Sequence, residues 1–508
     1  MKHVTRFVVL LVMAAGVLSV VVPAQYHNYD AMTQKLQKMA SEHPNLIRLE
    51  SEGQTIGGRS IWAVTITRGE HQTKPAVLLV AGVEGSDVIA SEMALGFIES
   101  LVTHYGKIDS VTRLVENTTF YVFPRVHPDA SEAFWAPVRY ERQFNNRSMD
   151  LDFDGLENED GYEDINGDGL ITQMRVRDIT GEWVPDTETP LLLRKADPAK
   201  GERGTYKLYS EGIDNDKDGR FNEDEPGGVS FNHNFTFNYK FFQRGAGPHQ
   251  VSEAESRAVA DFCFAHPNIA LVYTFAKNGN LLHPWKVQKD DPAPRGASNK
   301  IISSVMKNDA GYVEFFAETF KKITGFKEAP EPSPGYGAFD EWAYYHFGRW
   351  SVSAPAWIVP VVDSLADTAK ESLKERENSV RKSTILSQTK KADPLKGERH
   401  LLRWLEATDQ RHKFVDWAAV EHPDFPDKKV EVGGFAPFVA INPPADSLAH
   451  LVNVHSRYLF WIAGQLAHID LEPLHVEKLS SHLYRVRVTM VNKGYLPTNC
   501  EMGTRNQW

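Results

Sequence analysis

The chain has 508 residues, 42% of them hydrophobic and 24% charged, which is an ordinary composition for a globular protein. Its formal net charge of −11 at pH 7 argues against nucleic acid or an anionic membrane surface as a partner. With only two cysteines, Cys263 and Cys500, the sequence predicts no disulfide framework. The length predicts a main domain with one or two smaller pieces.

The first 24 residues have the pattern of a secretory signal peptide. Lys2 and Arg6 form a basic start, an apolar run covers 7–22, and small residues around Ala24 offer a cleavage site. An uncleaved membrane anchor is the alternative, although the apolar run is shorter than the ~20 residues that a span needs. We therefore expect a secreted or periplasmic protein that has no contact with the membrane after signal removal.

The next part of the chain alternates between strand and helix patterns. The predicted strands are SIWAVTIT (60–67), the apolar runs AVLLVAGV (76–83) and ALVYTF (270–275), and TTFYVFPRV (118–126). Continuous apolar runs are typical of strands that are covered on both faces. A helical stripe of apolar residues follows the second strand. This alternation predicts an α/β sheet between layers of helices.

Composition divides the mature chain into several parts. We assign 25–363 to the main domain, interrupted by an insertion at 145–228 that is rich in Asp, Asn and Gly. Residues 364–400 are strongly charged and predict a linker, and 401–471 predict a helical extension. Within 472–508, the alternating pattern HLYRVRVTMV predicts a strand, which we interpret as the start of an incomplete β-domain.

The insertion contains one full match to the EF-hand loop formula. In DNDKDGRFNEDE (214–225) a glycine occupies the turn position. The predicted calcium ligands are Asp214, Asp216, Asp218, Arg220 through its backbone carbonyl, Asn222 and Glu225. A solvated acidic loop without a metal is the alternative interpretation. We expect a structural calcium site, because carboxylates this close together repel one another unless a cation lies between them.

Two further stretches match this formula only in part. The weaker candidates are Asp164, Asn166 and Asp168 in one loop, and Asp150, Asp152 and Asp154 in the other. The twelfth position of the first loop is Arg175, and that of the second is Gly161, so neither has the bidentate glutamate.

Over most of residues 26–360 the chain resembles the zinc carboxypeptidases of the carboxypeptidase A type. The matching segments, in the expected order, are SEGQTIGGRSIWAVTIT, PAVLLVAGVEGSDVIASEMAL, YVFPRVHPDA, GVSFNHNF, VSEAESRAVADF, TFAKNGNLLHP and GAFDEWAYYHFGRWSVSAPAW. The acidic insertion and HPDFPDKKVEVGGF (422–435) resemble a secreted bacterial branch of that family. The resemblance implies a mixed, mostly parallel sheet flanked by helices.

The resemblance also implies a zinc site, yet this sequence departs from it at each position. The family's first ligand pair, His-x-x-Glu, falls on Glu84 and Asp87, and the third ligand falls on Ala276. The expected general base falls on Pro355, which cannot accept a proton. Zinc is therefore not expected, because a methyl group cannot replace an imidazole as a ligand.

The substrate-binding positions implied by the resemblance are also altered. Its Asn-Arg pair becomes Asn232 and His233, and Tyr336 lies near the position of a mobile tyrosine. The Asn of its NPDG-like turn becomes His127. Three arginines could correspond to its carboxylate-binding arginine: Arg139, Arg142 and Arg147.

Two functions are compatible with this sequence. The first is an inactive homologue, without zinc or a general base, whose cleft binds a peptide or a peptidoglycan fragment. The second is a carboxypeptidase-type hydrolase that uses Glu84, Asp87 and His233 with another metal or with none. Two carboxylates and one imidazole suit calcium, magnesium or manganese better than zinc.

Overall fold

The computed structural model describes most of the chain after the predicted signal peptide. The described residues are 25–150, 155, 157–158, 160–222, 227–287, 302–326, 335–362 and 393–507. The predicted signal peptide and most of the predicted linker at 364–400 lie outside these ranges. Among the described helices, none is both long and apolar enough to cross a membrane.

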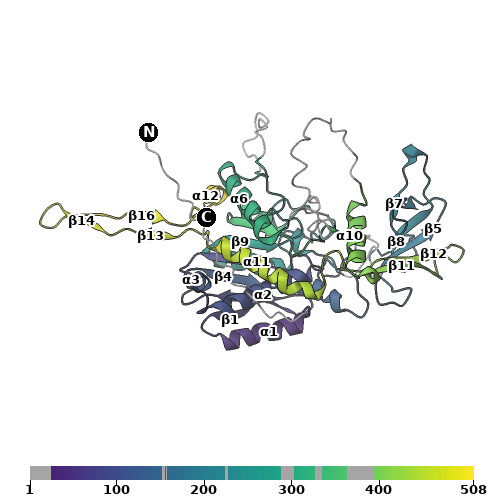
Figure 1. Cartoon of the computed structure of the whole chain (residues 1–508), viewed down its shortest axis with the longest axis horizontal. Coiled ribbons are helices and arrows are strands. Elements are labelled where there is room, and N and C mark those ends of the chain that lie inside the picture. Colours follow the sequence, from purple (N-terminus) through teal and green to yellow (C-terminus); the bar gives the residue numbers. More distant parts are fainter. Residues whose placement is uncertain are drawn as a thin grey trace, which may run out of the picture.

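A six-stranded sheet forms the centre of the molecule, in the order β1-β2-β4-β3-β9-β10 (Figure 1). The pairs β4–β3, β3–β9 and β9–β10 are parallel, and β1–β2 and β2–β4 are antiparallel. The strand bounds are β1 Ile47–Gln54, β2 Ser60–Ile66, β3 Ala76–Val80, β4 Thr119–Phe123, β9 Ile269–Phe275 and β10 Trp350–Ala354. The predicted mixed, mostly parallel sheet is confirmed.

The central strands are buried on both faces, as their continuous apolar sequences predict. Every residue of β3, β4 and β10 is buried. In the parallel register, Val80 of β3 lies opposite Thr274 of β9, and Phe275 of β9 lies opposite Ala354 of β10. These three strands therefore end together, and the residues that follow them meet at one edge of the sheet.

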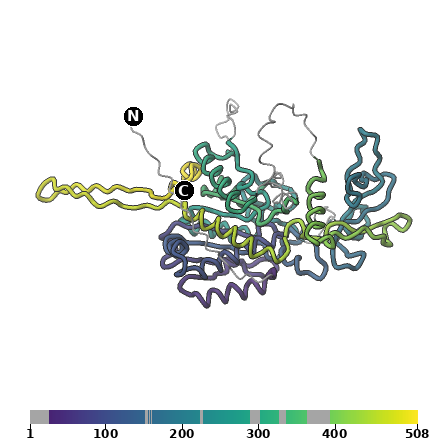
Figure 2. The backbone as a smooth tube through the Cα atoms, viewed as in Figure 1, coloured from purple at the N-terminus to yellow at the C-terminus, as the bar shows by residue number. Residues whose placement is uncertain are grey.

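Helices pack around this sheet and include segments from both ends of the chain. The bounds are α1 Tyr29–Glu42, α2 Val88–His104, α3 Asp109–Asn117, α4 Pro128–Ser131, α5 Ala254–Ala265, α6 Lys307–Thr324, α7 Phe339–Tyr345, α10 Lys396–Ala407, α11 Leu448–Ala463 and α12 Glu501–Asn506. Figure 2 shows α11, in yellow-green, crossing the purple and blue N-terminal half. Helix α11 packs against α2 and α6.

Residues 401–471, predicted as a helical extension, contain strands besides α10 and α11 and share the core of the main domain. Leu401 and Trp404 of α10, and Val452 and Tyr458 of α11, belong to the same hydrophobic core as the central sheet. The physical reason is that α2 buries 14 of its 17 residues and therefore needs cover on several sides. Helix α11 provides part of that cover.

The insertion at 145–228 is more than the acidic loop that its composition predicts. Its four strands join two C-terminal strands in a second, antiparallel sheet with the order β11-β12-β5-β8-β6-β7. The bounds are β5 Gln173–Arg177, β6 Trp183–Pro185, β7 Leu193–Lys195, β8 Tyr206–Ser210, β11 Phe414–Val420 and β12 Val430–Phe435. Met174, Val176, Val430 and Val432 form its small core.

The last part of the chain, predicted as the start of an incomplete β-domain, forms an extended arm in this structure. The strands β13 Ile469–Leu471, β14 His475–Lys478, β15 Tyr484–Arg487 and β16 Met490–Asn492 form one long two-stranded arm that leaves the body (Figure 1). The chain then returns to the body as α12. The backbone amides of Glu501 and Met502 donate to the buried carboxylate of Asp309, at 2.8 and 3.3 Å.

Substitution of a single glycine should test the packing of α11 on α2. A Cβ added to Gly96 would lie 2.5 Å from both methyl groups of Val452, whereas one added to Gly311 of α6 meets nothing within 4 Å. We expect Gly96→Ala to lower the free energy of unfolding by about 1–3 kcal/mol. Gly311→Ala, the control, should raise it by about 0.5–1 kcal/mol. Denaturant titrations in which Gly96→Ala equals the wild type would contradict this packing.

Candidate functional site

The loops after β3, β9 and β10 bring together the residues that replace the expected zinc site. We call Glu84, Asp87, Ala276, Lys277 and Pro355 the carboxyl edge. The turn after β3 requires Gly82, whose φ is +70° and whose Cα faces the backbone of the next loop. At this edge the amide of Lys277 contacts Glu84, and the amide of Ala276 contacts Ala354, which precedes Pro355.

Glu84 is held by hydrogen bonds from protein groups. The backbone amide of Lys277 lies 3.3 and 3.2 Å from its two carboxyl oxygens, and the side-chain amide of Asn232 donates to Oε1 at 3.2 Å. The carbonyl oxygen of Asn232 accepts in turn from the backbone amide of Phe339 at 2.9 Å. Asn232 is therefore a bridge between Glu84 and α7.

Asp87 has a structural task as well. It is the N-cap of α2, where its side chain accepts from the backbone amide of Ala90 at 3.2 Å. Burial raises the pKa of Asp87 to about 7. Burial also raises the pKa of Glu84 to about 8, and the charge of Asp87 adds to that increase. Both groups are therefore protonated for a large part of the time near neutral pH.

The edge does not fit a zinc ion. The side chain of Ala276 is buried, and its backbone amide donates to the backbone carbonyl of Ala354 at 3.0 Å. This hydrogen bond extends the pairing of β9 with β10 by one residue. Pro355 follows directly and offers no proton acceptor in its side chain. Within the described residues, the one group of three potential ligands close enough to share a metal ion lies elsewhere, in the insertion. Glu84, Asp87 and His233 are not brought together in this way.

His233 and Tyr336 lie against each other. Their rings stack with centroids 4.3 Å apart, and the Tyr336 hydroxyl donates to the backbone carbonyl of Arg244 at 2.8 Å. His233 Nδ1 is buried without a hydrogen-bond partner, and burial lowers the pKa of this imidazole. The tyrosine is thus tethered over the histidine in this structure.

Three charged residues at or near the carboxyl edge were not predicted from the sequence as site residues: Lys277, Asp340 and Glu341. Lys277 is exposed directly after Ala276. Asp340 is buried and accepts from the Ser353 hydroxyl at 2.6 Å, and its charge raises the pKa of Glu84 further. Burial raises the pKa of Glu341 to about 7, and its Oε2 has no hydrogen-bond partner. The sequence feature that could have identified the two acids is their adjacency in an otherwise apolar segment, DEW at 340–342.

The three candidate arginines have different surroundings. The backbone carbonyl of Arg142 accepts from Ser86 at 3.2 Å, beside the Glu84 turn, while its guanidinium donates to the carbonyl of Asn145 at 2.8 Å. Arg147 is paired with Glu253 at 3.0 Å. Arg139 joins the insertion through backbone bonds to 169 and 171. Of these contacts, the one to the Glu84 turn is made by the backbone of Arg142 and not by its guanidinium.

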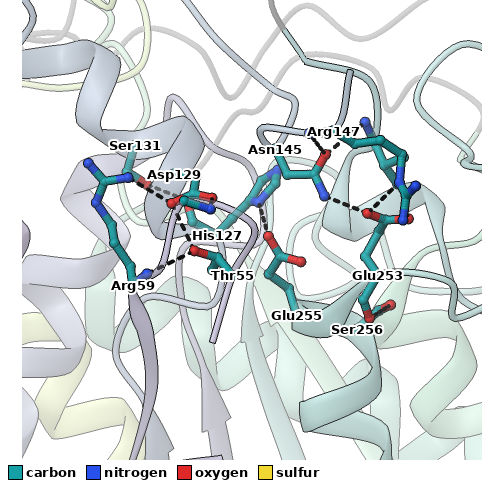
Figure 3. Close-up of polar contacts among 12 residues, drawn as sticks. Thr55, Arg59, His127, Asp129, Ser131, Asn145, Arg147, Glu253, Glu255 and Ser256 are labelled. Atoms are coloured by element: carbon teal, nitrogen blue, oxygen red, sulfur yellow. Dashed lines mark hydrogen bonds and ion pairs between the residues drawn. The ribbon is translucent and has the colours of Figure 1, made fainter. Parts of the chain in front are cut away.

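A buried polar network contacts the loop at 143–147 (Figure 3). His127 donates through Nε2 to the backbone carbonyl of Gln143 at 3.0 Å, and its Nδ1 faces Glu255 at 4.0 Å. Asn145 donates to Glu253 at 2.7 Å. Burial lowers the pKa of His127 to about 4 and raises that of Glu255 to about 7. His127 therefore has a positioning role between the sheet and the loop at 143–147.

The second candidate site is the predicted calcium loop. The carboxylates of Asp214, Asp216 and Asp218 lie close enough to share one metal ion. Asp214 Oδ2 accepts from the Gly219 amide at 3.0 Å, whereas its buried Oδ1 has no partner. Asn222 Oδ1 is also buried without a partner. These unpaired oxygens suit a hard cation.

The loop is anchored to distant segments on both sides. Asp424 accepts from the Asp214 amide at 3.1 Å and pairs with Lys217 at 2.9 Å. Asp160 accepts from the amides of Asn215 and Asn222. Asp424 therefore connects this loop of the insertion to the C-terminal segment. Arg220 is described, but Glu225 lies outside the described residues.

The partial loops differ from this one. Both carboxyl oxygens of Asp164 accept backbone amides, including Gly167 and Gly169 at 2.8 Å. Asn166 and Asp168 likewise accept amides two residues ahead, at 2.9 Å. Asp150 accepts from Gly155, while Asp152 and Asp154 lie outside the described residues. In the full loop Asp216 and Asp218 accept the equivalent amides. The two loops therefore differ at the first position, where both oxygens of Asp164 accept hydrogen bonds and Oδ1 of Asp214 accepts none.

Comparison with known proteins finds similarity to carboxypeptidases in the N-terminal part of the chain. Residues 32–168 match the family model described as zinc carboxypeptidase. Carboxypeptidase M of Mus musculus is 30% identical over 154 residues, which cover 28% of this chain and 35% of that protein. Zinc carboxypeptidase A 1 of Drosophila melanogaster is 36% identical over 110 residues, 21% of this chain and 25% of its own length.

Residues 32–168 are therefore similar to the zinc carboxypeptidase family. The chain spans about a third or less of the length of these curated relatives. Among solved structures, carboxypeptidase A from Helicoverpa armigera aligns with 68% of each chain at 15% identity and a TM-score of 0.42. Residues 468–508 match a separate family described only as a domain of unknown function.

The raised pKa of Glu84 should make stability depend on pH. Its folded pKa of about 8 lies above the ordinary value of 4.5, so its contribution is complete below pH 4.5 and is lost as the pH rises through 8. Between pH 5 and 8 we expect Glu84→Gln to gain about 2–3 kcal/mol relative to the wild type. Glu318→Gln, on the exposed side of α6, is the control. Parallel pH profiles for Glu84→Gln and the wild type in thermal melts would contradict the burial of this carboxyl group.

Proposed function

We propose that the carboxyl edge binds the end of a peptide or peptidoglycan fragment and does not hydrolyse it with zinc. The observation that carries this proposal is the pair Ala276 and Pro355 at the ends of β9 and β10. Neither side chain can bind a metal or accept a proton, and both stand beside Glu84. The match to the zinc carboxypeptidase family ends at residue 168, before either position.

Lys277 supports a binding role for this edge. Its exposed ammonium group acts electrostatically on Glu84, Asp87 and Glu141. Because Glu84 and Asp87 hold protons near neutral pH, their negative charge does not fully neutralise this cation. A free terminal carboxylate of a peptide is the chemical group that such a cation would attract. Asn232, His233 and Tyr336 would then flank the ligand.

Peptide binding and zinc content can be measured on the same preparation. We expect a peptide with a free C-terminal carboxylate to bind more tightly than its amide in calorimetric titrations. Lys277→Ala should weaken binding of the free acid roughly tenfold and leave the amide unchanged. Lys322→Ala, an exposed lysine of α6, is the matched control. Plasma emission analysis should find no stoichiometric zinc.

Two results would contradict this function. One equivalent of tightly held zinc would show that other groups complete a metal site at the carboxyl edge. Release of C-terminal residues, detected by mass spectrometry, would show hydrolysis. If that release is lost in Glu84→Ala and survives removal of calcium, the hydrolase that uses Glu84, Asp87 and His233 is the better description.

We further propose that the protein is exported and that the loop at 214–222 holds a structural calcium ion there. Asp214, Asp216 and Asp218 would bind the ion, with Asn222 as a further oxygen ligand. Oxygen ligands of this kind fit calcium, and extracellular concentrations near ~1 mM would fill even a weak site. Burial raises the pKa of Asp214, and the neighbouring Asp216 raises it further. A bound ion would neutralise this repulsion between the carboxylates.

Calcium should therefore stabilise the protein through this loop. At ~5 mM calcium and a dissociation constant of about 10⁻⁴ to 10⁻³ M, the gain is about 1–2 kcal/mol. We expect thermal melts to show this gain in the wild type and in Asp164→Asn, and to show none in Asp214→Asn. Addition of a chelator should reverse it. An equal response of all three proteins would contradict a site at Asp214.

A further inference from the structure

The two-stranded arm presents an apolar surface that nothing in the chain covers among the described residues. Every residue from 471 to 490 is exposed. An isolated hairpin is at best marginally stable in water, because it buries few apolar side chains. The arm nevertheless projects away from the body as a continuous element (Figures 1 and 2). This combination of length, apolar content and exposure is typical of a surface that meets a partner.

The pairing register separates the arm into two faces. Val476 lies opposite Val486, and Leu471 opposite Met490, so these apolar pairs share one face. We call this the apolar face. Every second residue of the returning strand from Tyr484 to Met490 is apolar, and the pairing shifts by one residue between the β14–β15 and β13–β16 ladders. With that shift the face has eight apolar residues: Ile469, Leu471, Leu474, Val476, Tyr484, Val486, Val488 and Met490. Lys478, opposite Tyr484, lies on the same face. Their side chains are between 47% and 73% exposed.

The opposite face of the outer half of the arm is charged. His475 lies opposite Arg487, and Glu477 lies opposite Arg485, with which it forms an ion pair at 3.2 Å. A sheet with one apolar face and one charged face is the usual design of half a β-sandwich, in which the apolar faces meet and the polar faces meet water. The arm therefore lacks a second sheet of the same kind.

We propose that the apolar face is a self-association surface on which the arms of two copies of the chain pack face to face. Eight apolar side chains at about half exposure amount to on the order of 800 Å², which is about the area per partner of a standard protein interface. A two-fold interface brings the same patch of each copy together, so one apolar face supplies both halves. This proposal is independent of the peptide-binding function.

The charges of the arm favour an antiparallel arrangement of the two copies. Near the base Asp470 pairs with Lys493, which leaves Glu472, and towards the turn Arg485 pairs with Glu477, which leaves Lys478 and Arg487. Antiparallel packing places the basic end of each arm beside the acidic base of the other. An anionic membrane is a poorer partner, because Arg485 is neutralised by Glu477 and the whole chain carries a net charge of −11.

The test uses two substitutions at neighbouring positions on opposite faces of the arm. Val476→Glu introduces a charge into the apolar face, and His475→Glu introduces the same charge into the charged face. We expect the full chain to sediment as a dimer, and Val476→Glu to raise the dimer dissociation constant at least about tenfold. His475→Glu should leave it unchanged. Thermal melts at a concentration well below the dimer dissociation constant should show the same midpoint for both variants.

Three outcomes would overturn the proposal. The first is a wild-type chain that stays monomeric up to about 100 µM in sedimentation equilibrium. The second is an equal loss of dimer in both variants, which would place the interface elsewhere. The third is a monomer that binds phosphatidylglycerol vesicles in flotation assays and loses that binding in Val476→Glu, which would make the apolar face a membrane surface.

Discussion

The parallel pairing of β3, β9 and β10 is the constraint on which the candidate site depends. Because these strands run in the same direction in register, the residues after them meet at one edge although they are almost 200 and 270 positions apart. In this chain that edge holds a carboxyl group, a methyl group and a pyrrolidine ring. Glu84 accepts hydrogen bonds from Lys277 and Asn232, which fix the turn without a metal ion. The turn at this edge is therefore held by hydrogen bonds within the protein, and its side chains differ from the zinc ligands that the family resemblance implies.

The second organising feature is the return of the C-terminal segment. Strands β11 and β12 extend the sheet of the insertion, and α11 lies on α2 in the main core. Asp424, from the same C-terminal segment, holds the amide of Asp214 and the ammonium group of Lys217. Asp424 thus joins this loop to a part of the chain about 200 residues away. The candidate metal loop and the second sheet are therefore both held by the same C-terminal segment.

Local patterns predicted what local physics determines. Continuous apolar runs revealed the buried strands, and the spacing of Asp214, Asp216 and Asp218 predicted carboxylates that converge. The pairing of β12 with β5 joins residues more than 250 positions apart, and no local pattern encodes it. No local pattern encodes the contact between the amide of Lys277 and Glu84 either, because the two residues are far apart in the sequence. His127 was identified only as a departure from a family turn, because its partner Glu255 comes from a distant helix.

Anomalous diffraction from crystals soaked separately in zinc and in calcium salts tests the central claim most directly. The central claim is that the metal site of this chain has no counterpart at the carboxyl edge. We expect a calcium peak between Asp214, Asp216 and Asp218, and no zinc peak between Glu84 and Ala276. A well-occupied zinc peak coordinated by Glu84 and Asp87 would contradict the account, whatever the peptide-binding measurements show.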